Sequence, residues 1–142
     1  MPDLARAASL YQSTFGVPVG PFRFMPDQGI AVAFVEMGQT HLELIAPIGD
    51  SSPISHVLGT HTIQDFLARQ PLGGLHHVCY LVDDLAAAWD RLRQVGMRRL
   101  GTGEPIIGAA GLPILFLDPA AADGVLIELK GRFRSAGLSG LA

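Results

Sequence analysis

The chain has 142 residues, which is enough for one domain with a buried core. Hydrophobic residues make up 49% of it and the formal net charge is −3. This composition excludes a disordered chain, and the absence of a basic run gives no electrostatic support for nucleic-acid binding. No apolar run reaches the roughly 18–20 residues that a membrane-spanning helix needs, and the first residues lack the pattern of a signal peptide.

The first half of the chain predicts one helix followed by strands. A helix is expected over residues 3–15, with Asp3 as N-cap and Gly16 as the residue that ends it. Its apolar face consists of residues at helical spacing, namely Leu4, Ala8, Tyr11 and Phe15. Strands are expected over residues 29–35 and 40–45, joined by a turn at residues 37–39.

The second half predicts the same elements again, preceded by one more strand. After a connector over residues 47–71, which includes a possible short helix at 63–69, a strand is expected over residues 75–82. A helix over residues 84–95 follows, with Leu85, Trp89, Leu92 and Val95 on its apolar face. Strands over residues 112–117 and 125–129 complete this half.

The two halves therefore predict one unit, β-α-β-β-β, used twice. The first strand of the first copy is apparently absent because Met1 precedes the helix directly. We predict an α+β fold in which the two modules form a curved mixed sheet with the helices outside. Within one domain, we divide the chain into the first module (1–46), the connector (47–71), the second module (72–130) and a tail (131–142).

Three residues carry the candidate chemistry: Glu43, His77 and Glu128. Each Glu stands between two apolar residues of a predicted strand, so it points to the opposite face of the sheet. Carboxylate and imidazole ligands on a rigid sheet suit a divalent metal with open positions for substrate oxygens. Charges on a solvated sheet face and a hydrogen-bonded core histidine are the alternative interpretations. Because a strand alternates its faces, only one of His76 and His77 is expected to face this site.

The remaining candidates are interpreted as structural. Cys79 is the only cysteine, so it cannot form an internal disulfide, which favours a reducing cytoplasm. We expect Cys79 to be an inert buried thiol. His56 and His61 lie in the connector at a spacing that does not place them on one helical face, so we expect them on the solvated surface.

The chain resembles the vicinal oxygen chelate (glyoxalase-like) superfamily, and within it the methylmalonyl-CoA epimerases. The resemblance extends to about Lys130. The stretches that carry it include Pro26-Asp27-Gln28-Gly29, Leu42-Glu43-Leu44-Ile45-Ala46-Pro47, Gly74-Leu75-His76-His77-Val78 and Gly124-Val125-Leu126-Ile127-Glu128-Leu129.

This resemblance implies a metal-dependent enzyme that epimerises a 2-methylmalonyl-CoA-like thioester through a metal-stabilised enolate. It implies Glu43, His77 and Glu128 as metal ligands, Glu128 as the catalytic base and Glu43 as a possible second catalytic group. The divalent ion is Co, Mn, Zn, Ni or Mg, and no other cofactor is expected. The partners are an acyl-CoA-like small molecule and a second copy in a homodimer.

The family pattern also has a His on the first strand, which in this chain would fall upstream of Met1. We expect a His-bearing strand to precede Met1 in the full gene product, or a neighbouring chain to supply it. Val32 stands where some relatives carry a carboxylate base, so the second acid/base group is unassigned. Lysines typical of the family are also replaced here, by Leu112 and Ala120.

Two other functions remain open at this stage. One is a different enzyme of the same superfamily, either a glyoxalase-type lyase or a dioxygenase with two His and one Glu around Fe(II). The other is a non-catalytic small-molecule binding relative on the same fold, which the missing first ligand would favour. Substrate profiling and metal analysis would separate the three functions.

Overall fold

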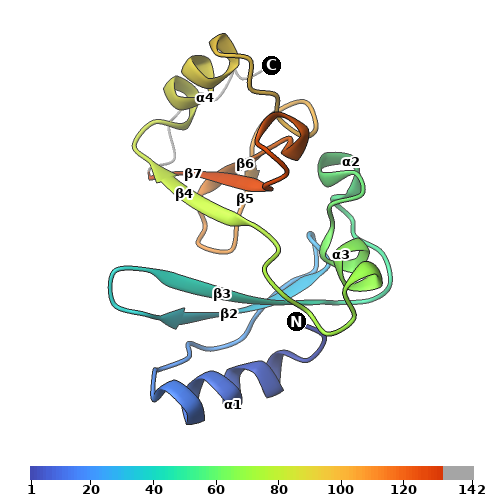
Figure 1. Ribbon diagram of the computed structural model, residues 1–142, viewed down its shortest axis with the longest axis vertical. Helices are drawn as coiled ribbons and strands as arrows, with labels where there is room; N and C mark the ends of the chain where they lie inside the picture. Colours follow the sequence, from blue (N-terminus) through green and yellow to red (C-terminus); the bar gives the residue numbers. More distant parts are fainter. Residues whose placement is uncertain (133–142) are drawn as a thin grey trace. The chain divides into compact units, whose positions relative to one another are not determined.

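A computed structural model describes residues 1–132, which form two compact units (Figure 1). Unit 1 comprises residues 1–56 and 60–75, and unit 2 comprises residues 57–59 and the chain from His76 onward. Each unit combines a β-sheet with one long helix, which confirms the predicted α+β fold of two related modules. Most of the tail expected over residues 131–142 lies outside the described residues.

Unit 1 contains the first long helix and an antiparallel sheet. The helix is α1 (Leu4–Phe15), and the sheet has the order β1-β2-β3, formed by β1 (Arg23–Met25), β2 (Ile30–Glu36) and β3 (His41–Pro47). The helix ends are those that the sequence predicts. The Asp3 side chain accepts a hydrogen bond from the Arg6 backbone N–H, and Gly16 ends the helix in the left-handed conformation (φ 63°).

The core of unit 1 lies between α1 and one face of the sheet. Alternate residues of β2 and β3 supply the sheet side of this core, as period-2 alternation requires. The buried residues are Leu4, Ala7, Ala8, Ala31, Ala33, Val35, Leu44 and Ala46. Because Leu44 faces α1, its neighbour Glu43 lies on the opposite face of the sheet.

Two short helices occupy the connector. The helix α2 (Ser55–Leu58) was not predicted, whereas α3 (Ile63–Arg69) has the predicted bounds. In α3, the Thr62 hydroxyl caps the N-terminus by accepting from the Asp65 backbone N–H. The Gln64 amide then ties α3 to the start of β2 by donating to the Gly29 carbonyl at 3.0 Å.

Unit 2 has a mixed sheet with the order β4-β7-β6-β5. Its elements are β4 (Val78–Val82), α4 (Leu85–Gln94), β5 (Ile106–Ile107), β6 (Pro113–Leu117), the 3₁₀ helix η1 (Pro119–Ala121) and β7 (Ile127–Gly131). β4 runs parallel to β7, and the other pairs are antiparallel. This is the complete β-α-β-β-β module. Its core, between α4 and the sheet, consists of Leu85, Trp89, Leu115, Leu117 and Leu129.

The residues that precede α1 and α4 have equivalent positions in the two modules. The α-amino group of Met1 donates to the Ile45 carbonyl at 2.6 Å, on the edge of β3 opposite β2, and burial lowers the pKa of this amino group. In unit 2, Val82 has the same place before its helix and pairs with Gly131 of β7. Leu42-Glu43-Leu44 and Ile127-Glu128-Leu129 are corresponding stretches at the ends of the two modules, and aligning them matches Gly131 with Ala46, the neighbour of Ile45. Among residues 1–132 no strand pairs with this edge of β3, and the expected upstream strand stays a prediction.

The strand bounds differ from the prediction at one functionally important place. β4 begins at Val78 rather than at Leu75, so His76 and His77 lie in the loop before the strand. The expectation that Cys79 is buried was wrong, because this residue is exposed on β4, which is an edge strand of its sheet. Within the described part of the chain, no helix is both long and apolar enough to cross a membrane.

Candidate active site

The candidate site lies on the face of the unit 2 sheet that points away from α4. In β6 and β7, Leu115, Leu117 and Leu129 pack toward α4, so the residues between them point to the other face. Glu128 of β7 lies there beside Phe116 of β6, with which it pairs in the sheet. Cys79 of β4 pairs with Glu128 from the other side.

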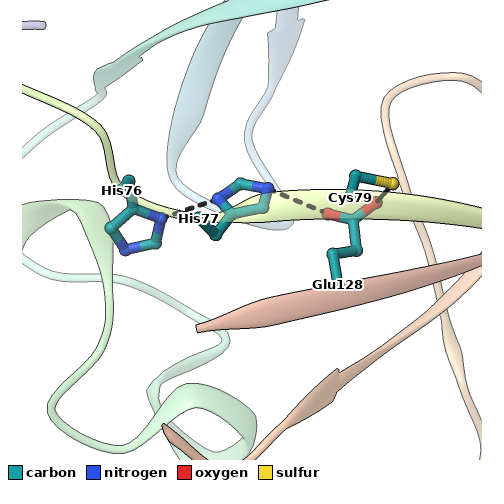
Figure 2. Close-up of polar contacts among 4 residues, drawn as sticks. All are labelled: His76, His77, Cys79 and Glu128. Atoms are coloured by element: carbon teal, nitrogen blue, oxygen red, sulfur yellow. Dashed lines mark hydrogen bonds and ion pairs between the residues drawn. The ribbon is translucent and has the colours of Figure 1, made fainter. Parts of the chain in front are cut away.

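Three polar contacts connect this group of residues (Figure 2). The His77 Nε2 atom lies 3.2 Å from Glu128 Oε2. The Cys79 thiol donates to the other carboxylate oxygen, Glu128 Oε1, at 3.3 Å. His76 Nδ1 and His77 Nδ1 are 2.8 Å apart, so the two rings form a further hydrogen bond. His76, His77, Glu128 and Cys79 therefore form one continuous chain of contacts.

The contact between His77 and Glu128 at the centre of this chain is nearly buried. The side chains of His77 and Glu128 are only 11% and 9% exposed, respectively. The Phe116 ring packs edge-on against His77, with the ring centroids 5.6 Å apart. A buried carboxylate must have hydrogen-bond partners, and here a thiol and an imidazole fill that need. One carboxylate oxygen of Glu128 thus faces His77 and the other faces Cys79. The carboxylate can therefore act as a base, or it can bind a metal together with His77.

The geometry of His77 and Glu128 fits a divalent metal. Two metal–ligand bonds of about 2.1 Å, meeting at about 90–110°, place their donor atoms about 3.0–3.4 Å apart. The observed Nε2–Oε2 distance of 3.2 Å falls in this range. Imidazole nitrogen and carboxylate oxygen are also donors that the first-row divalent ions accept. Within residues 1–132, however, no group of three or more His, Cys, Asp or Glu side chains gathers into a complete metal site.

Glu43 has the equivalent position in unit 1. It lies in the middle of β3, pairs with Phe34 of β2, and is half-buried on the face opposite α1. Val32 is fully buried in β2 and pairs with Ile45, so it shares this face with Glu43. Both predicted Glu residues thus occupy the face of their sheet opposite the helix. The assignment of Glu43 to one site with His77 and Glu128 stays a prediction.

Sequence reasoning missed the roles of His76 and Cys79. The alternation argument placed His76 and His77 on opposite faces, but both precede β4, and their rings meet. Cys79 was interpreted as an inert core thiol, whereas it donates to the candidate base. The separation of Cys79 from His77 by two residues was the available signal. The expectation that the connector histidines lie on the surface is confirmed for His56, which is exposed and has its Nδ1 3.1 Å from the Pro53 carbonyl oxygen, whereas His61 is half-buried.

Comparison with known proteins identifies the superfamily of this chain. A family model described as the Glyoxalase/Bleomycin resistance protein/Dioxygenase superfamily matches residues 1–116. Since this match spans most of the chain, the protein belongs to that superfamily. The result confirms the resemblance that the sequence motifs indicate.

Two similar relatives belong to one branch of this superfamily, the methylmalonyl-CoA epimerases. The chain is 45% identical over 130 residues to the ethylmalonyl-CoA/methylmalonyl-CoA epimerase of Cereibacter sphaeroides, covering 92% of this chain and 90% of that one. It is 39% identical to the mitochondrial methylmalonyl-CoA epimerase of Mus musculus, covering 92% and 67%.

Two similar solved structures are also of methylmalonyl-CoA epimerases. A crystal structure of a selenomethionine methylmalonyl-CoA epimerase matches with a TM-score of 0.78 and 31% identity, covering 94% of this chain and 90% of that one. A methylmalonyl-CoA epimerase in complex with methylmalonyl-CoA and NH4+ matches with a TM-score of 0.77 and 28% identity, covering 96% and 89%. The fold of both units is therefore that of the epimerases.

Proposed function

We propose that this protein interconverts the two C2 epimers of methylmalonyl-CoA. The observation that carries the proposal is the nearly buried Glu128 carboxylate, held between the Cys79 thiol and the His77 imidazole on the helix-free face of its sheet. The 45% identity to an epimerase over nearly the full length of both chains supports the same substrate class.

The reaction requires only the movement of a proton. The C2–H bond of a 2-methylmalonyl thioester is acidified by the neighbouring thioester carbonyl. A carboxylate base takes this proton, the bonding electron pair passes into the thioester to give an enolate, and a proton returns to C2 from the opposite face. We assign Glu128 as the base. Glu43 is the candidate for the second acid/base group or for a further ligand.

We assign a different role to each of the two carboxylate oxygens of Glu128. Oε2 faces His77, and we assign this oxygen with His77 Nε2 to a divalent metal. Oε1 is held by the Cys79 thiol and is the oxygen available for proton transfer. A bound divalent ion would supply Lewis-acid stabilisation of developing negative charge, typically several kcal/mol of the barrier. The ion is one of Co, Mn, Zn, Ni or Mg, and Glu43 is the candidate third ligand.

The remaining expectations are part of the same proposal. The substrate is an acyl-CoA, because the similar solved structures include complexes with methylmalonyl-CoA and with 2-nitronate-propionyl-CoA. We also propose that the protein acts as a homodimer in the cytoplasm. The sheet edge of β3 opposite β2, which lacks a partner strand within residues 1–132, is one place where a second chain could contribute.

The test is proton exchange at C2. One epimer of methylmalonyl-CoA is incubated with the protein in deuterated water, and both deuterium uptake and formation of the other epimer are measured. Ethylmalonyl-CoA serves as a second substrate, and malonyl-CoA without a C2 substituent shows whether exchange needs the branch. The proposal expects exchange and epimerisation that fall after treatment with a chelator and return with a divalent metal. Acyl-CoA binding without any exchange would contradict it.

A further inference from the structure

His76 and His77 form a hydrogen bond through the same type of ring nitrogen. They are adjacent in the loop before β4, with Nδ1 atoms 2.8 Å apart and ring planes at 88° (Figure 2). A hydrogen bond between two imidazole nitrogens needs one proton between them, so one Nδ1 donates and the other accepts. The other nitrogen of His77, Nε2, faces the Glu128 carboxylate at 3.2 Å. The position of the proton on His77 is therefore coupled to both neighbours.

This coupling has two arrangements for a neutral His77. When His77 donates from Nε2–H to the Glu128 carboxylate, its Nδ1 has no proton and must accept from His76. When His77 Nε2 instead presents its lone pair to a metal, the single proton of the ring lies on Nδ1 and is donated to His76. The hydrogen bond between the rings persists in both arrangements, but its direction reverses.

We propose that His76 is a positioning residue that holds His77 in the tautomer needed for metal binding through Nε2. This inference rests on the metal pair of the proposed function. Ligating histidines usually donate their second N–H to a carboxylate, a carbonyl or water, and removing that acceptor typically weakens metal affinity about 10–100-fold. Here the acceptor is a neighbouring imidazole. Because the Phe116 ring packs against His77 from another side, the orientation of His77 does not depend on His76 alone.

Two substitutions separate the acceptor role from simple packing. Asparagine at position 76 offers an amide oxygen close to the place of the histidine Nδ1, so His76→Asn keeps an acceptor for His77 Nδ1–H. His76→Ala removes the acceptor. His56→Ala is the matched control, because His56 is an exposed histidine that contacts the Pro53 carbonyl and takes no part in the site. Thermal unfolding of each variant checks that the fold is retained.

Zinc is the probe, and affinity is measured by competition with a chromogenic chelator. We expect His76→Ala to bind zinc about 10–100-fold more weakly than the wild type, and His76→Asn and His56→Ala to stay within about threefold. Nitrogen-15 NMR of the wild-type histidines gives a readout independent of any variant. We expect the His77 proton on Nε2 without zinc and on Nδ1 with zinc.

Different outcomes would contradict the role of His76 and the metal assignment of the proposed function. Zinc binding by His76→Ala at wild-type affinity, or His76→Asn as weak as His76→Ala, would overturn the role of His76 while leaving the metal site intact. A His77 proton that remains on Nε2 when zinc is bound would do the same. A wild-type protein that binds no zinc and still catalyses C2 exchange would overturn the metal assignment and, with it, this role of His76.

Discussion

Replacing Glu128 with glutamine tests the centre of the proposed mechanism. Gln has nearly the same shape as Glu, so the packing beside Phe116 is retained. Its amide oxygen can accept only from one of the two neighbours, the Cys79 thiol or His77, and its NH₂ then faces the other. One weakened hydrogen bond costs about 0.5–1.5 kcal/mol of stability, which is too little to unfold a domain of typical stability. The fold should therefore survive.

The effect on catalysis should be much larger. Positioned general bases contribute about 10²–10⁴-fold, equivalent to about 2.7–5.4 kcal/mol of the activation barrier. An amide cannot take up the C2 proton, so we expect deuterium exchange by Glu128→Gln to fall by this factor. The assay follows exchange into methylmalonyl-CoA by mass spectrometry, with metal content measured on the same sample. Excess metal in a second assay shows whether lost ligation accounts for the deficit.

A matched control is available in unit 1. Glu36 lies at the end of β2, and its half-exposed side chain forms an ion pair with His41 at 2.9 Å. Exposed pairs contribute about 0–1 kcal/mol, so Glu36→Gln should leave exchange within about twofold of the wild type. Exchange by Glu128→Gln at the wild-type rate, with the fold intact, would refute the assignment of Glu128 as the base.

Three further predictions follow from the packing. Cys79→Ala removes a donor to Glu128 and should slow exchange about 2–10-fold, whereas Cys79→Ser keeps a donor and should recover most of the rate in the same assay. Gly29→Ala should lower the free energy of unfolding in urea by more than Gly38→Ala. Both glycines have positive φ (70° and 78°), but only at Gly29 would an added Cβ meet another atom, Pro53 Cδ at 2.8 Å. Equal losses in the two variants would contradict this. Leu117→Ala, in the core beneath α4, should cost about 2–5 kcal/mol by the same measurement, and a loss below 1 kcal/mol would show that this core is not well packed.

Local signals in the sequence determined the helices and most of the strands. Asp3 and Gly16 fix the ends of α1 because capping and the left-handed conformation depend on the residues at those positions alone. Apolar spacing likewise identified core residues of α1 and α4, including Leu4, Ala8, Leu85 and Trp89. It was wrong at the C-terminal end of each predicted helix, where Phe15 is 59% exposed and Val95 is 77% exposed. Strand alternation placed Glu43 and Glu128 on the faces opposite the helices. The repeat itself could be found from these features, whereas the family was indicated by the resemblance of particular stretches such as Gly74-Leu75-His76-His77-Val78.

Only the tertiary structure decided how the site is connected. Alternation could not orient His76 and His77, because β4 begins after them and a loop has no fixed period. Cys79 was assigned to the core from its apolar neighbours, but strand order places β4 at a sheet edge, where its side chain is exposed and reaches Glu128. Strand order depends on which distant segments pair, here β4 with β7 in parallel. That pairing is set by packing over the whole unit, and no short stretch of sequence encodes it.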